Sequence, residues 1–235
     1  VTVNNSIPSN LVAHWPFDEG NGTTTADISG NDHTATLING PVWTTGKTGN
    51  AINFDGSNDL VNAGNFDVTG NQLTLTAWMN ADQFTHLSSR DSRIIAKTTD
   101  TAVQAHYWML STIKRGKTDT RLRFRLKTGT SPNSGTTTLI ASSGNLATNS
   151  WIHVAAVYDG VTMTLYKDGL AVGSTEKSGN IATNSAVVVA IANNPPGGGS
   201  VPFDGTLDDI RVYDRALSAQ DIQALVTAAS DNTPP

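Results

Sequence analysis

Residues 151–170 read WIHVAAVYDGVTMTLYKDGL, and this stretch carries the clearest secondary-structure signal of the chain. The runs 151–158 and 162–167 are rich in β-branched and aromatic residues, and each is followed by an Asp-Gly pair, at Asp159–Gly160 and Asp168–Gly169. Asp-Gly favours tight hairpin turns because glycine accepts the positive φ that these turns require. The stretch therefore predicts two antiparallel hairpins that form a meander with the segment that follows.

The run 151–158 is apolar on both of its faces, which is typical of a central strand covered on each side. We expect His153 within it to be a core histidine whose hydrogen-bonding groups are satisfied. Further short β-type runs separated by Gly, Asn and Asp recur along the chain, as in a sandwich or jelly roll. They cover residues 12–17, 51–54, 73–79, 93–97, 107–111, 121–127 and 186–192.

One short helix is predicted near the end of the chain. Ser218 is a suitable N-cap, Asp221 follows three residues later, and Leu217 is placed to pack onto Ile222. We expect this helix to pack against the edge of the sandwich and to have a structural role only.

Length and composition limit the remaining choices. A chain of 235 residues suits one all-β domain, and we expect an N-terminal extension at 1–10, a single domain at 11–229 and the start of a linker at 230–235. The absence of cysteine excludes disulfides, thiolate metal sites and cysteine nucleophiles. No apolar run approaches the roughly 20 residues of a membrane helix, so no membrane partner is expected. The Thr-, Asn-, Ser- and Gly-rich composition indicates an extracellular module of a larger protein, whose secretion signal lies upstream or has been removed.

Charge is strongly segregated along the chain. Residues 86–127 contain ten Lys and Arg but three Asp, whereas the whole chain has a net charge of −5. Within this region the strand 120–127, TRLRFRLK, alternates so that its cations share one face and its apolar residues the other. The residues that we expect to contact a ligand here, from this strand and its neighbourhood, are Arg90, Arg93, His106, Trp108, Arg121, Arg123, Arg125 and Lys127.

A row of arginines suits an anionic polymer. The planar guanidinium donates paired hydrogen bonds to carboxylate or sulfate, and every second strand residue repeats at about 6.6 Å. We therefore predict that the partner is an acidic polysaccharide, with the isolated module monomeric. The alternative is that outward cations only keep a sheet face soluble. Nucleic acid is a less suitable polyanion, because the sequence pI is 5.4 and the composition is that of an extracellular protein.

Seven short stretches, two of them within residues 151–170, follow one another along the chain. They are AHWPFDEGNG (13–22), DISGN (27–31), GNAINFDG (49–56), LTAW (75–78), WIHVAAVYDG (151–160), LYKDG (165–169) and FDGTLDDIRVY (203–213). In this order they resemble the laminin-G-like, concanavalin A-like modules of bacterial secreted proteins, over about residues 11–226. The resemblance implies an all-β, two-sheet antiparallel jelly-roll sandwich (concanavalin A-like) with one short C-terminal helix. It also implies a structural calcium in many members, and binding of carbohydrate or protein more often than catalysis.

Two acidic regions are candidates for calcium, which prefers six to eight hard oxygen ligands. One spans residues 18–32 and the other is the pair Asp208–Asp209. In the folds that this chain resembles the first and last strands are neighbours, which would bring the two regions together. The expected ligands are Glu19, Asp27, Asn31 and Asp209, with Asp18 and Asp208 in reserve. The alternative is that these Asp and Asn side chains only cap turns.

Catalysis is not expected. Glycosidases generally need two facing carboxyl groups, and the chain contains just two glutamates, Glu19 and Glu176. The segments RDSR (90–93) and QAH (104–106) resemble motifs of jelly-roll alginate lyases, but the glutamate and the tyrosine-bearing motif of those enzymes are missing. The sequence therefore predicts a non-catalytic, secreted bacterial carbohydrate-binding module. A protein-binding adhesion module and a polysaccharide lyase remain as alternatives.

Overall fold

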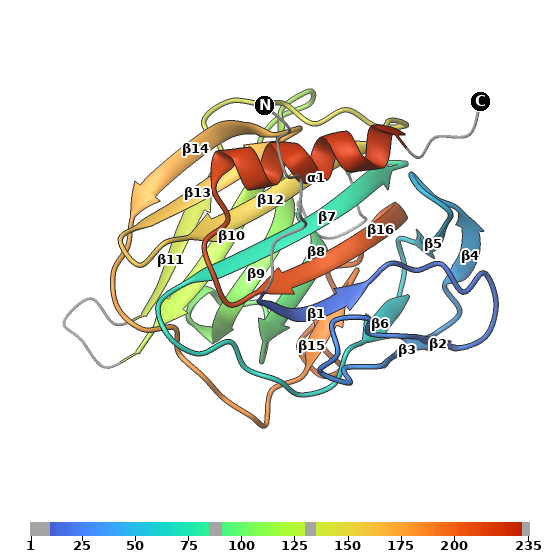
Figure 1. The fold of residues 1–235 in the computed structure, drawn as a ribbon, viewed down its shortest axis with the longest axis horizontal. Helices are drawn as coiled ribbons and strands as arrows, with labels where there is room; N and C mark the ends of the chain where they lie inside the picture. The colour runs from blue at the N-terminus through green and yellow to red at the C-terminus, as the bar shows by residue number, and fades with distance from the viewer. Residues whose placement is uncertain (1–9, 85–90, 130–134, 232–235) are drawn as a thin grey trace, which may run out of the picture.

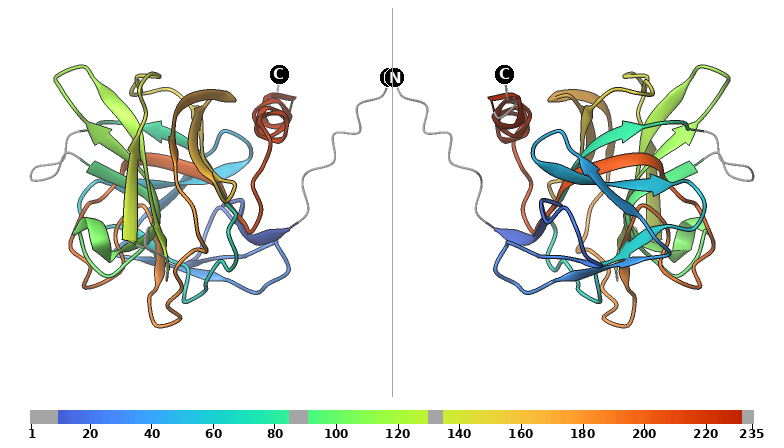
Figure 2. Two further views of the ribbon diagram at one scale, coloured as in Figure 1. Left: turned by 90° about the vertical axis from the view of Figure 1, so that its left-hand side faces the viewer. Right: turned by 90° about the vertical axis from the view of Figure 1, so that its right-hand side faces the viewer.

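The computed structural model describes residues 10–84, 91–129 and 135–231. Two antiparallel β-sheets pack face to face around one apolar core, and a single α-helix lies outside them (Figures 1 and 2). This is the predicted all-β sandwich with a C-terminal helix. None of the helices in the described residues is both long and apolar enough to span a bilayer.

The first sheet contains the meander and both ends of the domain. In spatial order its strands are β14 (Leu170–Glu176), β13 (Thr162–Lys167), β12 (Ile152–Tyr158), β7 (Leu73–Ala81), β16 (Asp204–Tyr213), β5 (Asn50–Asp55) and β4 (Val42–Thr45), while β1 (Leu11–Trp15) pairs with β16.

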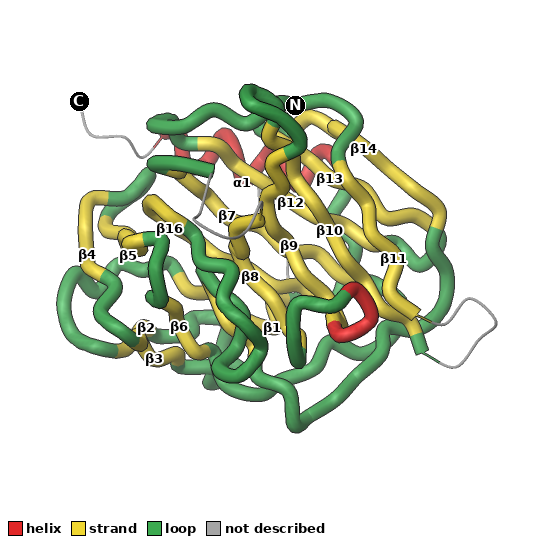
Figure 3. The backbone as a smooth tube through the Cα atoms, turned by 180° about the vertical axis from the view of Figure 1, so that it is seen from behind, coloured by secondary structure: helices red, strands yellow, loops and turns green. Residues whose placement is uncertain are grey.

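The second sheet forms the opposite layer and faces the viewer in Figure 3. Its order is β11 (Gly135–Ile140), β10 (Thr120–Thr128), β9 (His106–Lys114), β8 (Asp91–Thr98), β15 (Val189–Ile191), β6 (Leu60–Asn62), β3 (Ala35–Ile38) and β2 (Thr24–Thr25). A short 3-10 turn, η1 (Val103–Ala105), precedes β9.

The predicted meander is confirmed. Strands β12, β13 and β14 pair in succession, and the turn residues Asp168 and Gly169 have φ of 50° and 82°, as a tight hairpin requires. Strand β12 is buried along its whole length. His153 is buried as expected, with its ring edge-on to Trp78 at 5.2 Å. The expectation that its hydrogen-bonding groups are satisfied is wrong for Nδ1, which has no hydrogen-bond partner among the described residues.

The run 186–192 forms a strand only over Val189–Ile191. Its first residues turn instead, because Asn184 accepts hydrogen bonds from the backbone N–H groups of Ala186 and Val187. The sequence reading did not identify the short or threonine-rich strands β2, β3, β4, β6 and β11. They become strands mainly by pairing with stronger neighbours.

The helix α1 (Ala219–Asp231) has the predicted capping box. Ser218 N–H donates to the Asp221 carboxylate at 2.9 Å, and Asp221 N–H donates to the Ser218 hydroxyl at 3.1 Å. The predicted position at the sandwich edge is wrong, because α1 lies across the outer face of the first sheet (Figure 1). That face of β12 is apolar and has to be covered. The side chains that form this second apolar cluster are Ala155, Val157, Tyr213, Leu217, Ile222 and Leu225.

Candidate functional site

Arginines of the basic strand lie on the outer face of the second sheet, opposite the core residues Leu122 and Phe124. The expectation of direct ligand contact is wrong for Arg93 on β8 and for Arg123 and Arg125 on β10, because these side chains are buried, at 0%, 3% and 8% exposed. Local sequence alternation identifies which side of the sheet a residue faces, but not whether loops cover that side.

Protein groups occupy most of these guanidinium donors. Arg123 donates to the Asp91 carboxylate at 2.6 Å and to the Ser111 hydroxyl at 3.2 Å. Arg93 Nε donates to the side-chain oxygen of Asn194 at 2.8 Å, and its backbone N–H donates to the carbonyl of Val201. The segment around residues 193–201 therefore packs against β8 at Arg93.

His106 lies between two of these arginines. Its Nδ1 is 2.7 Å from the carbonyl oxygen of Ala102, which assigns the N–H to that nitrogen. Its Nε2 then accepts from Arg93 Nη2 at 3.2 Å and lies 3.3 Å from Arg125 Nη1. Burial, together with the charges of Arg93 and Arg125, lowers the pKa of His106 to about 4. The imidazole is thus a buried neutral acceptor and not a free base.

The cluster retains excess positive charge. Among the described residues, Asp91 is the carboxylate that pairs with Arg93 and Arg123. Arg93 Nη1 and Arg125 Nε find no hydrogen-bond partner within the described ranges. Burial and then repulsion by Arg123 lower the pKa of Arg93 to about 9 and that of Arg125 to about 10. Arg93 and Arg125 therefore remain protonated at neutral pH, and the cluster imposes a positive potential on this face.

The remaining predicted ligand residues differ in exposure. Arg121 is half-buried and pairs with Asp119, while Lys127 is half-buried, donates to the Gln104 carbonyl at 3.0 Å and lies 5.2 Å from the Tyr107 ring centre. Trp108 is not an exposed platform, because its ring is in the core, 1% exposed. Arg90 lies outside the described residues.

Two of the predicted calcium ligands, Asp27 and Glu19, brace turns. The Asp27 carboxylate accepts backbone N–H groups of Ser29, His14 and His33 at 2.8 to 3.0 Å. Burial opposes ionisation of Asp27, but these hydrogen bonds lower its pKa overall. Glu19 accepts the N–H of Ala26 at 2.6 Å.

Asn31 and Asp209 are likewise engaged. The Asn31 amide donates to the carbonyl of Leu11 at 2.8 Å. Asp209 lies 2.6 Å from His14 Nε2 and accepts from Arg211 at 2.9 Å. Burial opposes ionisation, but the bonds to His14 and Arg211 outweigh it and lower the pKa of Asp209 to about 2. The first and last strands are neighbours as expected, and the two acidic regions meet through His14.

The two reserve candidates, Asp18 and Asp208, approach the turn 46–50 together. Asp208 accepts the N–H groups of Lys47 and Thr48 at 2.8 and 3.1 Å, and Asp18 accepts that of Asn50 at 2.9 Å. Asp208 is 1% exposed, and this burial is the main cause that raises its pKa to about 7. The charges of Asp209 and Asp18 also raise this pKa, whereas the backbone hydrogen bonds to Asp208 lower it.

Oxygen atoms crowd this turn. A Cβ at Gly46 would lie 2.4 Å from the Asn50 carbonyl oxygen and 2.6 Å from Asp208 Oδ2, so this position has room only for glycine. Within the described ranges, no three His, Cys, Asp or Glu side chains gather as a metal cluster. A cation at this turn would therefore need backbone oxygens as well as the two carboxylates.

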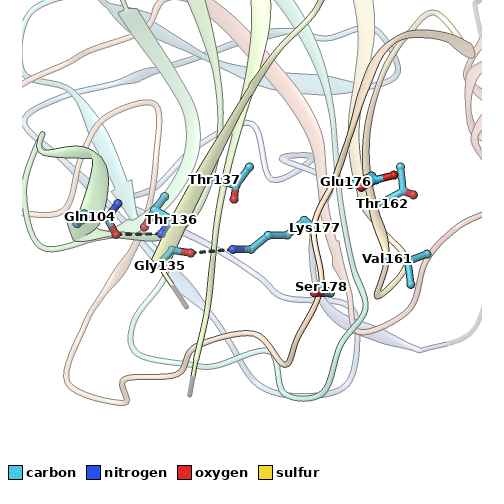
Figure 4. A pocket seen from close by; sticks show the side chains of 9 residues that line it. All are labelled: Gln104, Gly135, Thr136, Thr137, Val161, Thr162, Glu176, Lys177 and Ser178. Carbon is cyan, nitrogen blue, oxygen red and sulfur yellow. Dashed lines mark hydrogen bonds between the residues drawn. The ribbon is translucent and has the colours of Figure 1, made fainter. Parts of the chain in front are cut away.

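A polar cleft of about 680 Å³ lies elsewhere, between the start of β11 and the ends of β13 and β14 that are remote from their shared hairpin, near Thr162 and Glu176 (Figure 4). Its lining was not predicted, because it combines residues from four separate parts of the chain. They are Gln104, Gly135, Thr136, Thr137, Val161, Thr162, Glu176, Lys177 and Ser178.

Comparison with known proteins identifies the family. The family model Laminin_G_3, described as the concanavalin A-like lectin/glucanases superfamily, matches residues 55–223. The chain belongs to this superfamily. A search of curated proteins finds no match.

Solved structures of the superfamily fold are similar over nearly the whole chain. Domain 4 of an extracellular arabinanase from Geobacillus stearothermophilus, in complex with arabinotriose, is 21% identical with a TM-score of 0.69, over 92% of this chain and 98% of that one. The binding domain of Paraclostridial Mosquitocidal Protein 1 is 17% identical, with a TM-score of 0.71, over 95% and 53%. A Trypanosoma rangeli sialidase is 15% identical, with a TM-score of 0.66, over 95% and 33%. At these identities the likeness establishes the fold.

Proposed function

We propose that this chain is a non-catalytic carbohydrate-binding module of a larger extracellular protein. The superfamily includes lectins, and the similar arabinanase domain was determined in complex with arabinotriose. The observation that carries the non-catalytic assignment is the burial of Arg93 and His106, together with the hydrogen bond between them. These two residues come from the segments that resemble lyase motifs, yet both are 0% exposed and the free nitrogen of His106 accepts from arginine. A general base has to reach the substrate proton.

An acidic polysaccharide is the proposed ligand class. Support comes from the positive potential of the buried arginine cluster and from Arg121 and Lys127, which are only half-buried on β10. The buried guanidinium groups attract the polyanion at long range, and Arg121 and Lys127 contact it directly.

Variants of the accessible cations test this assignment. We expect Arg121→Gln with Lys127→Gln to weaken retention on alginate and on sulfated polysaccharide by about tenfold, through loss of two charge-assisted contacts. Lys167→Gln, on β13 of the other sheet, is the matched control and should bind as the wild type does. Unchanged retention of the double variant would refute the role of this strand, and release of sugar products would refute the non-catalytic assignment.

Calcium at the turn 46–50 is a further part of the proposal. Asp18 and Asp208 supply hard carboxylate oxygens, and the Asn50 carbonyl lies beside Asp208 at Gly46. These donors fit calcium, which accepts backbone carbonyls as ligands. A bound cation would also favour the ionised form of Asp208, whose burial otherwise raises its pKa to about 7.

Melting curves in chelator and after calcium readdition test the calcium proposal. The wild type should gain stability on readdition, since a ligand that binds the folded state raises the melting temperature. Asp208→Asn should lose this gain, whereas Asp27→Asn, which removes a turn brace, should keep it despite a lower starting stability. An unchanged wild-type melting temperature would contradict the proposal.

A protein-binding adhesion module is the second candidate. It is favoured by the similarity to toxin binding domains, such as that of Paraclostridial Mosquitocidal Protein 1. Capture of one identified protein partner, unaffected by competing glycans, would support this candidate over the first.

A further inference from the structure

The polar cleft between the two sheet ends has a lining suited to sugar hydroxyl groups. We propose that it binds an uncharged oligosaccharide segment, at a site separate from the basic strand. The cleft volume of about 680 Å³ lies within the usual range of small-ligand sites. One wall comes from β11 and the other from β13 and β14, and their facing side chains are visible in Figure 4.

Hydrogen-bonding groups with spare capacity line both walls. Within the part of the chain that the structure describes, the hydroxyls of Thr137, Thr162 and Ser178 make no hydrogen bond with protein, and neither does the Glu176 carboxylate. Hydroxyls donate and accept, and a carboxylate accepts from two adjacent hydroxyls. This combination complements a sugar, in which neighbouring carbons each carry an O–H group.

The floor of the cleft is held in place. Lys177 is 7% exposed and its ammonium group donates to the Gly135 carbonyl at 2.9 Å, so it links the two walls (Figure 4). Gln104 accepts the N–H of Thr136 at 2.9 Å, and the Thr136 hydroxyl donates to the His106 carbonyl at 3.0 Å. The Lys177 bond holds the two walls together, and the bonds of Gln104 and Thr136 hold β11 against η1 and β9, so the cleft is ordered before a ligand arrives and the entropic cost of binding is reduced.

The charges that line the cleft and its exposed apolar surface favour an uncharged ligand. The lining carries one cation, Lys177, and one anion, Glu176, so the cleft offers no net attraction to an acidic chain. The exposed carboxylate of Glu176 would repel a uronate or sulfate. Val161, 65% exposed, provides apolar surface for the C–H groups of a sugar ring.

The test is titration of the isotope-labelled chain with cellotriose, xylotriose, mannotriose and arabinotriose, followed by backbone amide chemical shifts. We expect at least one of these uncharged trisaccharides to shift the amides of residues 135–137, 161–162 and 176–178. Thr137→Val with Thr162→Val should weaken that binding by about tenfold, because each hydroxyl contributes one hydrogen bond. Glu176→Gln should weaken it by a similar factor.

Thr138→Val is the matched control, since Thr138 is exposed on the same strand but does not line the cleft, and it should bind as the wild type does. Cleft variants that remain folded should also keep wild-type retention on acidic polysaccharide, which separates this site from the basic strand. The proposal is overturned if none of the four trisaccharides shifts these amides, or if the cleft variants bind the trisaccharides as tightly as the control.

Discussion

Removing the Asp91 carboxylate should destabilise the fold strongly, because it would leave the arginine cluster uncompensated. Asp91 Oδ2 lies 2.6 Å from Arg123 Nη2 and 3.6 Å from Arg93 Nη1, and both arginine side chains are almost fully buried. Breaking a buried pair by deleting one partner costs about 3–5 kcal/mol. The Asp91 side chain is 20% exposed, so we take the lower end, about 3 kcal/mol. In a chain of this size that corresponds to a fall in melting temperature of roughly 6–12 °C.

Thermal and urea unfolding of Asp91→Asn would measure this loss. The matched control is Asp119→Asn, which breaks the more exposed pair with Arg121 and should cost less than about 1 kcal/mol. Arg121 lies on β10, as Arg123 does. Adding Arg123→Met to Asp91→Asn should restore part of the stability, because it removes a buried charge that has lost its partner. Equal stabilities of Asp91→Asn and Asp119→Asn would refute the assignment of Asp91 as the internal counter-ion.

Two further predictions concern the pH dependence of stability and the turn at Gly46. Burial is the main cause that lowers the pKa of His106 and of His153 to about 4. Below the ordinary pKa of about 6.5 the unfolded chain binds protons that the folded chain does not. The free energy of unfolding should therefore fall as pH drops from about 6.5 to 4, by up to about 1.4 kcal/mol per pH unit for each histidine. Urea unfolding across this range should show a shallower pH slope in His153→Gln; an unchanged slope would contradict its burial as a neutral ring. Separately, Gly46→Ala should lower the melting temperature and remove the calcium response, since its Cβ would lie 2.4 Å from the Asn50 carbonyl oxygen. Gly116→Ala should do neither, because its Cβ would meet only Asp119 Cβ, at an ordinary contact distance of 3.9 Å. A Gly46→Ala variant that kept both properties would contradict the described turn.

Local chemistry in the sequence was sufficient to predict much of the fold. The Asp-Gly turns fix the hairpins of the meander, and Ser218 with Asp221 marks the start of the helix through reciprocal hydrogen bonds. These signals depend on residues close together in the chain. The position of the helix was missed, because it depends on which sheet face lacks cover.

The candidate site was harder to predict from the sequence, because its geometry depends on contacts between residues that are far apart in the chain. Alternation correctly placed Arg123 and Arg125 on the outer face of β10, but their burial depends on residues distant in sequence, such as Asp91, which pairs with Arg123, and Thr101, whose carbonyl accepts from Arg125. The role of Asp91 as partner of Arg123 requires the order of three neighbouring strands. Likewise, Asp18 and Asp208 meet at a turn from a third region of the chain.

Affinity electrophoresis of the purified chain, in calcium-containing gels with alginate, a sulfated polysaccharide or a neutral polysaccharide, tests the carbohydrate-binding assignment most directly. The account predicts slower migration in at least one acidic gel, with the polysaccharide recovered at its original length. Unchanged migration in every gel, or shortened polysaccharide after incubation, would contradict it.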